Sequence, residues 1–470
     1  MISKFIDREK ETSLLEEEWE KEKGRLIILY GRRRIGKTRL LMEFIKAKDR
    51  KGVFYIAEES SAQIQINGLK EKIAEFLNDP LLRTLEIRDW EQLLGYLARN
   101  MPADRFYLII DEFSYVVRSD GRVLSVLQKL WDTKFSSSSI FIVLSGSMLG
   151  LMSEKVLSYA SPLYGRRSRD ILMDELAFKY AKEFVRMPFK EALQLYLIIG
   201  GVPEYLLKAY EYRSIDAFLE REFFSKNGYF YREPYFIISQ EFKELKTYFS
   251  ILNALAYGYT KPTEIANFTG METRGIYPYL ENLLRLGFIE RQVSILGSPK
   301  KGIYLIRDNI FDFWFNFVFK HREEIEREAF KLNEEEKNAY LGKKFERFAR
   351  DEIFRFLLPL EFERIGRWWH KGEEIDIVAV NDKKKLIAFF EVKWGKLSYR
   401  ETERLLNALR DKAKRVGLGW HVKGEEKERQ EYYGIIAESI EGKEELSNQG
   451  FMVYDLENLL NKNIKRNKRG

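Results

Sequence analysis

The chain has 470 residues, of which 45% are hydrophobic and 33% are charged. Because one hydrophobic core does not support this length, we expect several domains. The 80 basic residues exceed the 73 acidic ones, and the net charge of +7 is too small to indicate nucleic-acid binding by itself. The lack of cysteine excludes disulfides and thiolate metal sites. No apolar run reaches the ~18 residues of a membrane span, and the charged N-terminus does not resemble a signal peptide. We therefore expect a cytoplasmic protein with no membrane contact.

A short apolar run at 26–30 is followed directly by GRRRIGKT, from Gly31 to Thr38, and then by helical apolar spacing. A strand, a Gly-rich loop and a helix in this order predict a phosphate-binding loop. Gly31 and Gly36 would let backbone N–H groups face the phosphates of ATP beside the positive end of the helix. Lys37 would reach the β- and γ-phosphates, and Thr38 would bind Mg²⁺ through its hydroxyl.

A second apolar run, at 106–110, ends in two carboxylates. Asp111 would hold Mg²⁺ through the water shell of the ion, and Glu112 would polarise the attacking water. A third run, at 140–144, is followed by Ser145, Gly146 and Ser147. The serine side chains either sense the γ-phosphate between the two motifs or cap a helix.

Three arginines lie in the segment SPLYGRRSRD, at Arg166, Arg167 and Arg169. One of them is a candidate arginine finger, acting within the chain or on a neighbouring subunit. The alternative for each is a solvated surface side chain.

The motifs FIDREKE, GRRRIGKT, DEF, LSGS, LYGR and GGVP occur in this order. Over about residues 1–320 the chain resembles the archaeal P-loop ATPases related to the AAA+ and STAND groups, often called DEXX-box ATPases. This resemblance implies that Phe5, Arg8 and Glu9 border the adenine. It also implies that Pro203, in a turn of a helical lid, touches the base from the other side.

Helical apolar spacing continues through 170–225 and fits such a lid. Three further helices and a hairpin that ends near Tyr304 then predict a winged helix-turn-helix, with the helices at 248–257, 261–266 and 273–286. Such a module contacts DNA, or it serves as a spacer or a protein contact. Thr273, Arg274, Tyr277 and Tyr279 would lie on the third helix. The residues that favour DNA contact are few: Arg274, Arg285, Lys300 and Lys301.

The C-terminal part contains a charged helix and two apolar strands, GEEIDIVAVN and LIAFFEVKWG. Asp376 lies on the first strand, whereas Glu391 and Lys393 lie on the second and share a face because side chains alternate. Asp376 and Glu391 would bind one Mg²⁺, and Glu346 on the helix would reach the same ion. Lys393 would orient or deprotonate the attacking water.

This layout resembles the PD-(D/E)xK nuclease fold, in the version called DUF234 that follows archaeal ATPase modules. The resemblance implies metal-dependent cleavage of DNA. Domains of this kind also occur without activity, and the charged strand residues would then form salt bridges in a structural domain.

The predicted fold is a multidomain α/β protein with four parts: a P-loop ATPase core (1–170), a helical lid (171–240), a winged helix-turn-helix (241–320) and a nuclease-like domain (335–470). We expect a cytosolic ATPase with ATP and Mg²⁺ as cofactors that couples its nucleotide state to DNA binding or processing. The alternatives are a STAND-type signalling scaffold with a silent end domain, and a DNA-binding regulator that hydrolyses ATP very slowly. The sequence does not specify the oligomeric state or the preferred DNA.

Overall fold

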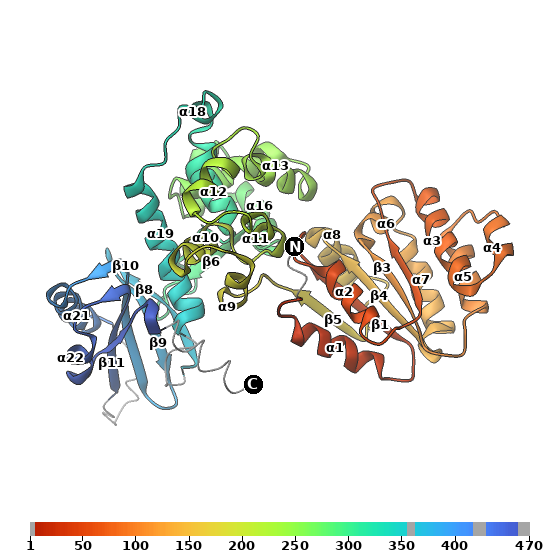
Figure 1. Ribbon diagram of the computed structural model, residues 1–470, viewed down its shortest axis with the longest axis horizontal. Coiled ribbons are helices and arrows are strands. Elements are labelled where there is room, and N and C mark those ends of the chain that lie inside the picture. Colours follow the sequence, from red (N-terminus) through yellow and green to blue (C-terminus); the bar gives the residue numbers. More distant parts are fainter. Residues whose placement is uncertain (1–4, 355–361, 417–428, 459–470) are drawn as a thin grey trace. The chain divides into compact units, whose positions relative to one another are not determined.

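The computed structural model describes residues 5–354, 362–416 and 429–458 (Figure 1). The chain forms two compact units, each assembled from several segments. The first consists of Met1–Leu176, Gly201–Ala209 and Ile237–Lys243, and the second of Ala177–Gly200, Tyr210–Phe236 and Glu244–Gly470. Parts of the predicted lid therefore belong to each unit. Within the described ranges, no helix is long and apolar enough to cross a membrane.

The first unit contains a sheet of five parallel strands in the order β2-β3-β4-β1-β5. Its central strands are continuous apolar runs because both faces of the sheet are covered. The strands are β1 (Arg25–Gly31), β2 (Gly52–Ile56), β3 (Phe106–Asp111), β4 (Ile140–Gly146) and β5 (Arg169–Met173). Three of them, β1, β3 and β4, contain the three apolar runs that the sequence predicted as strands.

Alternate side chains of β4 show how helices cover the two faces of this sheet. The Phe141 ring lies 5.2 Å from Trp19 and 5.6 Å from Phe44, on the face covered by α1 (Glu9–Trp19) and α2 (Lys37–Lys46). Ile140 and Ile142 belong to the core beneath α3 (Ala62–Leu77), α5 (Trp90–Arg99) and α7 (Val123–Thr133) (Figure 1). Shorter helices complete the unit: α4 (Pro80–Thr84), α6 (Phe113–Ser119), α8 (Leu149–Leu151) and α11 (Pro203–Ala209).

The second unit begins with helices and continues through three helices and an antiparallel hairpin. Its first helices are α9 (Phe178–Ala181), α10 (Phe189–Ile199), α12 (Ile215–Glu222) and most of α13 (Tyr229–Glu241). The three helices α14 (Leu245–Ala256), α15 (Pro262–Thr269) and α16 (Thr273–Arg285) then precede β6 (Ile289–Val293) and β7 (Gly302–Ile306). We call residues 245–306 the helix–hairpin segment; its elements follow the order expected of a winged helix.

The C-terminal part of the second unit, which we call the end domain, is a mixed five-stranded sheet with helices. The strand order is β12-β11-β10-β9-β8, with β8, β9 and β10 antiparallel and β10, β11 and β12 parallel. The bounds are β8 (Arg364–His370), β9 (Glu373–Asn381), β10 (Leu386–Leu397), β11 (Gln430–Ile440) and β12 (Met452–Tyr454). The helices of this region are α17 (Asn309–Phe313), α18 (Arg322–Glu326), α19 (Glu334–Phe348), α21 (Tyr399–Ala413) and α22 (Lys443–Asn448).

The loop of the β6–β7 hairpin packs on the end domain. The Ile295 N–H donates to the Arg367 carbonyl on β8 at 2.8 Å, and the Trp369 N–H donates to Ser294 Oγ at 3.1 Å. Ile295 and Leu296 also contact the apolar core that contains Trp368. The hairpin thus adds a short stretch of backbone to the edge of the end-domain sheet.

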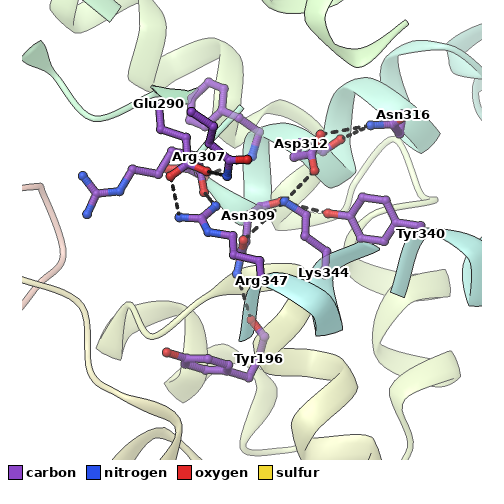
Figure 2. Close-up of polar contacts among 12 residues, drawn as sticks. Tyr196, Glu290, Arg307, Asn309, Asp312, Asn316, Tyr340, Lys344 and Arg347 are labelled. Carbon is purple, nitrogen blue, oxygen red and sulfur yellow. Dashed lines mark hydrogen bonds and ion pairs between the residues drawn. The ribbon is translucent and has the colours of Figure 1, made fainter. Parts of the chain in front are cut away.

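A polar junction connects α19 to α17 and β6 (Figure 2). Lys344 is buried, and its Nζ lies 2.5 Å from Asp312 Oδ2 and 3.4 Å from Asn309 Oδ1. One turn along α19, Arg347 donates to the Arg307 carbonyl at 2.6 Å. Helix α19 reaches this place because Asn333 caps its N-terminus by accepting two backbone N–H groups, and three glutamates in the first turn suit the helix dipole.

Candidate nucleotide site and end-domain ion cluster

The two glycines of GRRRIGKT are required for different reasons. Gly36 has a φ of 96°, a left-handed conformation that glycine adopts without strain, and it directly precedes α2. At Gly31, an added Cβ would lie 2.5 Å from the Met173 carbonyl oxygen on β5, so steric contact excludes a side chain. The loop between them directs the first backbone N–H groups of α2 toward the carboxyl edge of the sheet, where an anion gains from the helix dipole.

Lys37 is buried at the start of α2, and its ammonium lies on the loop. Its Nζ donates to the Gly31 carbonyl at 2.9 Å and to the Arg32 carbonyl at 3.0 Å. Burial lowers the pKa of Lys37, whereas the carboxylates of Glu112 and Asp111 act against that shift. The ammonium is thus held at the loop between carbonyl dipoles and two acids.

Thr38 and Asp111 are in direct contact, as expected for two groups that would share one cation. The Thr38 hydroxyl donates to Asp111 Oδ2 at 2.5 Å, and Asp111 Oδ1 accepts the Glu112 N–H at 3.0 Å. A hydroxyl and a fully buried carboxylate form the oxygen donor set that Mg²⁺ prefers, so these residues fit that ion.

Glu112 and Ser147 form the second polar pair at this edge. Glu112 has a φ of 52°, and its Oε2 accepts the Ser147 hydroxyl at 2.5 Å. Strand β4 lies between β1 and β3, which brings Ser147 between the loop and the acidic pair. The Ser145 hydroxyl is also buried here, and it has no hydrogen-bond partner within the described ranges. The positive φ of Glu112 is strained for a non-glycine residue, and such strain is often found at functional sites.

The residues that the resemblance places at the adenine lie in the first unit. Arg8 is buried, and it donates to the Ile35 carbonyl at 3.2 Å and pairs with Glu11 at 3.1 Å, so it supports the phosphate loop. Pro203 is the first residue of α11, whereas Glu9 is exposed. Their contact with the adenine stays a prediction.

Each of the three candidate finger arginines has an acidic partner. Arg166 lies 2.7 Å from Asp132, and Arg167 lies 3.0 Å from Asp170. Arg169, on β5, lies 3.1 Å from Glu18. These ion pairs hold the three side chains within the chain, and a finger role for one of them stays a prediction.

Glu241 was not singled out in the sequence, although it lies close to the phosphate loop. Its carboxylate accepts the backbone N–H groups of Gly150 and Leu149, and the charges of Arg33 and Arg32 act on it. Burial raises the pKa of Glu241. No sequence pattern around this residue resembles a phosphate site, so only the fold reveals its position.

In the end domain, the predicted residues of the two strands come together. The pairing of Phe390 with Ile377 brings the next residues, Glu391 and Asp376, opposite each other on β10 and β9. Lys393 Nζ lies 3.1 Å from Glu391 Oε2 and 3.8 Å from Asp376 Oδ2. Asp376 Oδ2 also accepts the Val392 N–H at 2.8 Å.

Sequence reasoning missed a fourth member of this cluster, Lys412 on α21. Its Nζ donates to Glu391 Oε1 at 2.6 Å. Burial and the neighbouring Glu391 raise the pKa of Asp376 to about 7. Burial would also raise the pKa of Glu391, but Lys393 and Lys412 bring it below its usual value.

Glu346 faces Arg367, whose guanidinium lies 4.0 Å from it and 2.9 Å from Glu374. In the described part of the chain, no three His, Cys, Asp or Glu side chains form a group that could hold a metal ion. Both oxygens of Glu391 accept from ammonium groups. In this arrangement, the end-domain residues do not fit the predicted Mg²⁺ site.

The helix–hairpin segment exposes part of its predicted DNA-facing surface. Arg274 and Tyr277 on α16 are exposed, as are Lys300 and Lys301 in the hairpin loop. The Tyr279 hydroxyl instead donates to Glu244 at 2.6 Å.

Comparison with known proteins matches two parts of the chain to protein families. A family described as an ATPase domain predominantly from Archaea matches residues 5–209. DUF234, described as archaeal and bacterial proteins of unknown function, matches residues 314–405. An uncharacterized protein of Methanocaldococcus jannaschii is 34% identical over 466 residues, which cover 96% of this chain and 99% of that relative. The chain belongs to the family of archaeal ATPases whose domain matches residues 5–209. The resemblance inferred from the motifs is thereby confirmed.

A solved structure supports the fold of the ATPase. A Walker-type ATPase of Pyrococcus abyssi aligns with a TM-score of 0.51 and 23% identity, over 67% of this chain and 96% of that one. The ORC2 protein of Aeropyrum pernix, solved as ADPNP and ADP complexes, aligns with a TM-score of 0.44 and 14% identity, over 69% of this chain and 95% of that one. The alignment with the Pyrococcus abyssi protein confirms the predicted P-loop α/β core, and the structure itself contains the further C-terminal sheet.

Proposed function

We propose that this ATPase binds ATP with Mg²⁺ at the phosphate loop, hydrolyses it, and couples its nucleotide state to DNA binding or processing. The observation that carries the proposal is the contact between the Thr38 hydroxyl and the Asp111 carboxylate at 2.5 Å. It joins the loop after β1 to the acidic end of β3, although the two residues are far apart in the sequence. Two oxygen ligands at the mouth of a phosphate loop are the arrangement that a metal–nucleotide complex requires.

Each polar group at this edge receives a role from its position. Lys37 would leave the two loop carbonyls and neutralise the phosphates, while the loop N–H groups bind the phosphate oxygens. Thr38 and Asp111 would hold Mg²⁺, which offsets phosphate charge when bound. Glu112 would accept a proton from the attacking water, and the Ser147 hydroxyl would hold the Glu112 carboxylate in place until then.

Contact with DNA is assigned to the helix–hairpin segment. Arg274 and Tyr277 lie exposed on α16, which has the position of a recognition helix in the predicted module. Lys300 and Lys301 add positive charge in the hairpin loop. These side chains would bind phosphates, which gives affinity that falls with salt.

DNA processing by the end domain is the part of the proposal that requires a rearrangement. Asp376, Glu391 and Glu346 are the proposed Mg²⁺ ligands, and Lys393 is the group proposed to act on the attacking water. We derive no cleavage step, because the lysines cover Glu391 in the observed arrangement.

The second candidate function is a scaffold of the STAND type with a silent end domain. One observation favours it: the hairpin loop, which would contact DNA in a free module, packs through Ile295 against β8. In this alternative, nucleotide exchange would change how the protein binds a partner protein.

A binding experiment separates the two candidates. Fluorescence anisotropy would measure the affinity of the full chain for a labelled DNA duplex without nucleotide, with ADP, and with a non-hydrolysable ATP analogue and Mg²⁺. We expect affinity to differ by about fivefold or more between the ADP and ATP-analogue states. Equal affinity in all three states would reject the coupling. An absence of DNA binding at low salt would favour the scaffold.

A further inference from the structure

The end-domain carboxylates hold two lysines where one lysine was predicted. Glu391 is almost fully buried, with 6% of its side chain exposed. Lys412 reaches its Oε1 from α21 at 2.6 Å, and Lys393 reaches its Oε2 from β10 at 3.1 Å. Both oxygens of the proposed bridging ligand are therefore occupied by charged donors.

Asp376, the second carboxylate of the cluster, is also in contact with hydrogen-bond donors. Its Oδ2 accepts the Val392 N–H at 2.8 Å and lies 3.8 Å from Lys393 Nζ. Each Glu391 oxygen keeps a second lone pair, but a divalent cation bound to both carboxylates would lie beside an ammonium group that it repels. Binding of the cation would therefore favour the departure of at least one ammonium group from Glu391. Exposure does not separate the two lysines, because 31% of the Lys412 side chain and 40% of the Lys393 side chain are exposed. Lys412 is the better candidate for displacement because it comes from helix α21, outside the sheet, whereas Lys393 lies on β10 itself.

The charges of the cluster also indicate that Lys412 competes with a cation. Asp376 and Glu391 carry two negative charges when ionised, and Lys393 and Lys412 supply two positive charges, which is the charge of one Mg²⁺. Glu346 adds a third carboxylate, which Arg367 compensates only in part because its guanidinium lies 4.0 Å from Glu346 and 2.9 Å from Glu374. Like charges at hydrogen-bond distance repel strongly in a partly buried site, so a cation and the Lys412 ammonium exclude each other at Glu391.

We infer that Lys412 occupies the place of a divalent cation at Glu391 and keeps the end-domain cluster free of metal. The inference rests on the proposed cation site of the end domain. It adds that the Lys412 ammonium prevents a cation from binding at that site. Since its stem has access to solvent, Lys412 can withdraw without unfolding the domain, whereas the two carboxylates are fixed on adjacent strands.

Binding of Mn²⁺ tests this inference with a readout that does not depend on cleavage. The full chain without nucleotide is titrated with Mn²⁺, and the free ion is measured by electron paramagnetic resonance. The variants are Lys412→Met, which removes the charge and keeps most of the stem, and Lys412→Arg, the matched control that keeps the charge. Asp376→Asn and the double variant Asp376→Asn/Lys412→Met define which binding belongs to the cluster.

We expect wild type and Lys412→Arg to show no Mn²⁺ binding that depends on Asp376. Lys412→Met should bind one Mn²⁺ per chain at the Asp376-dependent site, with an affinity at least about tenfold above the upper limit found for wild type. The reason is that one positive charge beside Glu391 has been removed. The double variant should lose that site. Wild-type binding that Asp376→Asn abolishes, with no gain in Lys412→Met, would overturn the inference and leave the cation site standing. If Lys412→Met gains no Mn²⁺ while it melts like wild type, both the inference and the proposed cation site fail.

Discussion

Removal of the Asp312 carboxylate should destabilise the second unit strongly. Asp312 compensates Lys344, whose side chain is 7% exposed and whose ammonium lies 2.5 Å from the carboxylate. Burial lowers the pKa of Lys344, and Asp312 opposes that shift. Without Asp312, the ammonium loses its ion pair and keeps Asn309 Oδ1 at 3.4 Å, the Tyr340 ring at 5.5 Å and the charge of Glu290 (Figure 2). Breaking a buried pair on one side costs about 3–5 kcal/mol, so we expect a loss of that order for Asp312→Asn.

A double-mutant cycle measures the interaction itself. Urea unfolding near neutral pH, followed by tryptophan fluorescence and circular dichroism, gives the free energy of unfolding of each variant. Lys344→Met removes the buried charge, and the double variant Asp312→Asn/Lys344→Met should recover most of the stability lost in Asp312→Asn. The reasoning is refuted if the free energy of unfolding of Asp312→Asn lies within about 1 kcal/mol of wild type. It is also refuted if the double variant is no more stable than Asp312→Asn.

Three further predictions concern the phosphate loop, the helix–hairpin segment and the end domain. Lys37→Ala should abolish tight binding of Mg²⁺·ATP in calorimetry, because N–H groups alone do not neutralise the phosphates; wild-type affinity would displace the assigned site. Reversal of Arg274, Lys300 and Lys301 should lower the slope of log DNA affinity against log salt by about one unit for each lost contact. Burial raises the pKa of Asp376 from 3.8 to about 7. The folded chain therefore holds this proton more tightly than the unfolded chain, and stability should fall as pH rises through that range. Thermal midpoints that fall equally in Asp376→Asn would contradict this.

The geometry of the proposed phosphate loop was predictable because its determinants are local. Gly31 to Thr38 lie within one βα turn, and a buried parallel strand is an apolar run that the sequence shows directly. The proximity of Asp111 to Thr38 followed from the parallel sheet, whose strand ends meet at one edge. Nothing local indicated that Glu241, far along the chain, would approach the same loop.

The end domain shows the limit of the same approach. The strand period correctly placed Asp376, Glu391 and Lys393 together, since neighbouring strands bring alternate residues to one face. Lys412 was missed because it lies on a charged helix that also carries Arg400, Arg404 and Arg410, and only the packing of α21 selects one of these basic residues. The apolar pair Ile295–Leu296 in a hairpin loop was an available signal that this loop is buried against another surface.

Hydrolysis by Glu112→Gln compared with wild type tests the central claim most directly. The amide keeps the shape of the side chain and its contact with Ser147, but it cannot accept a proton from water. Phosphate release in single-turnover experiments, with the protein in excess over Mg²⁺·ATP, should fall by about 10²-fold or more, while calorimetry should find ATP still bound. Phosphate release at the wild-type rate, from a variant that binds ATP normally, would contradict the assignment of Glu112 and with it the proposed site of hydrolysis.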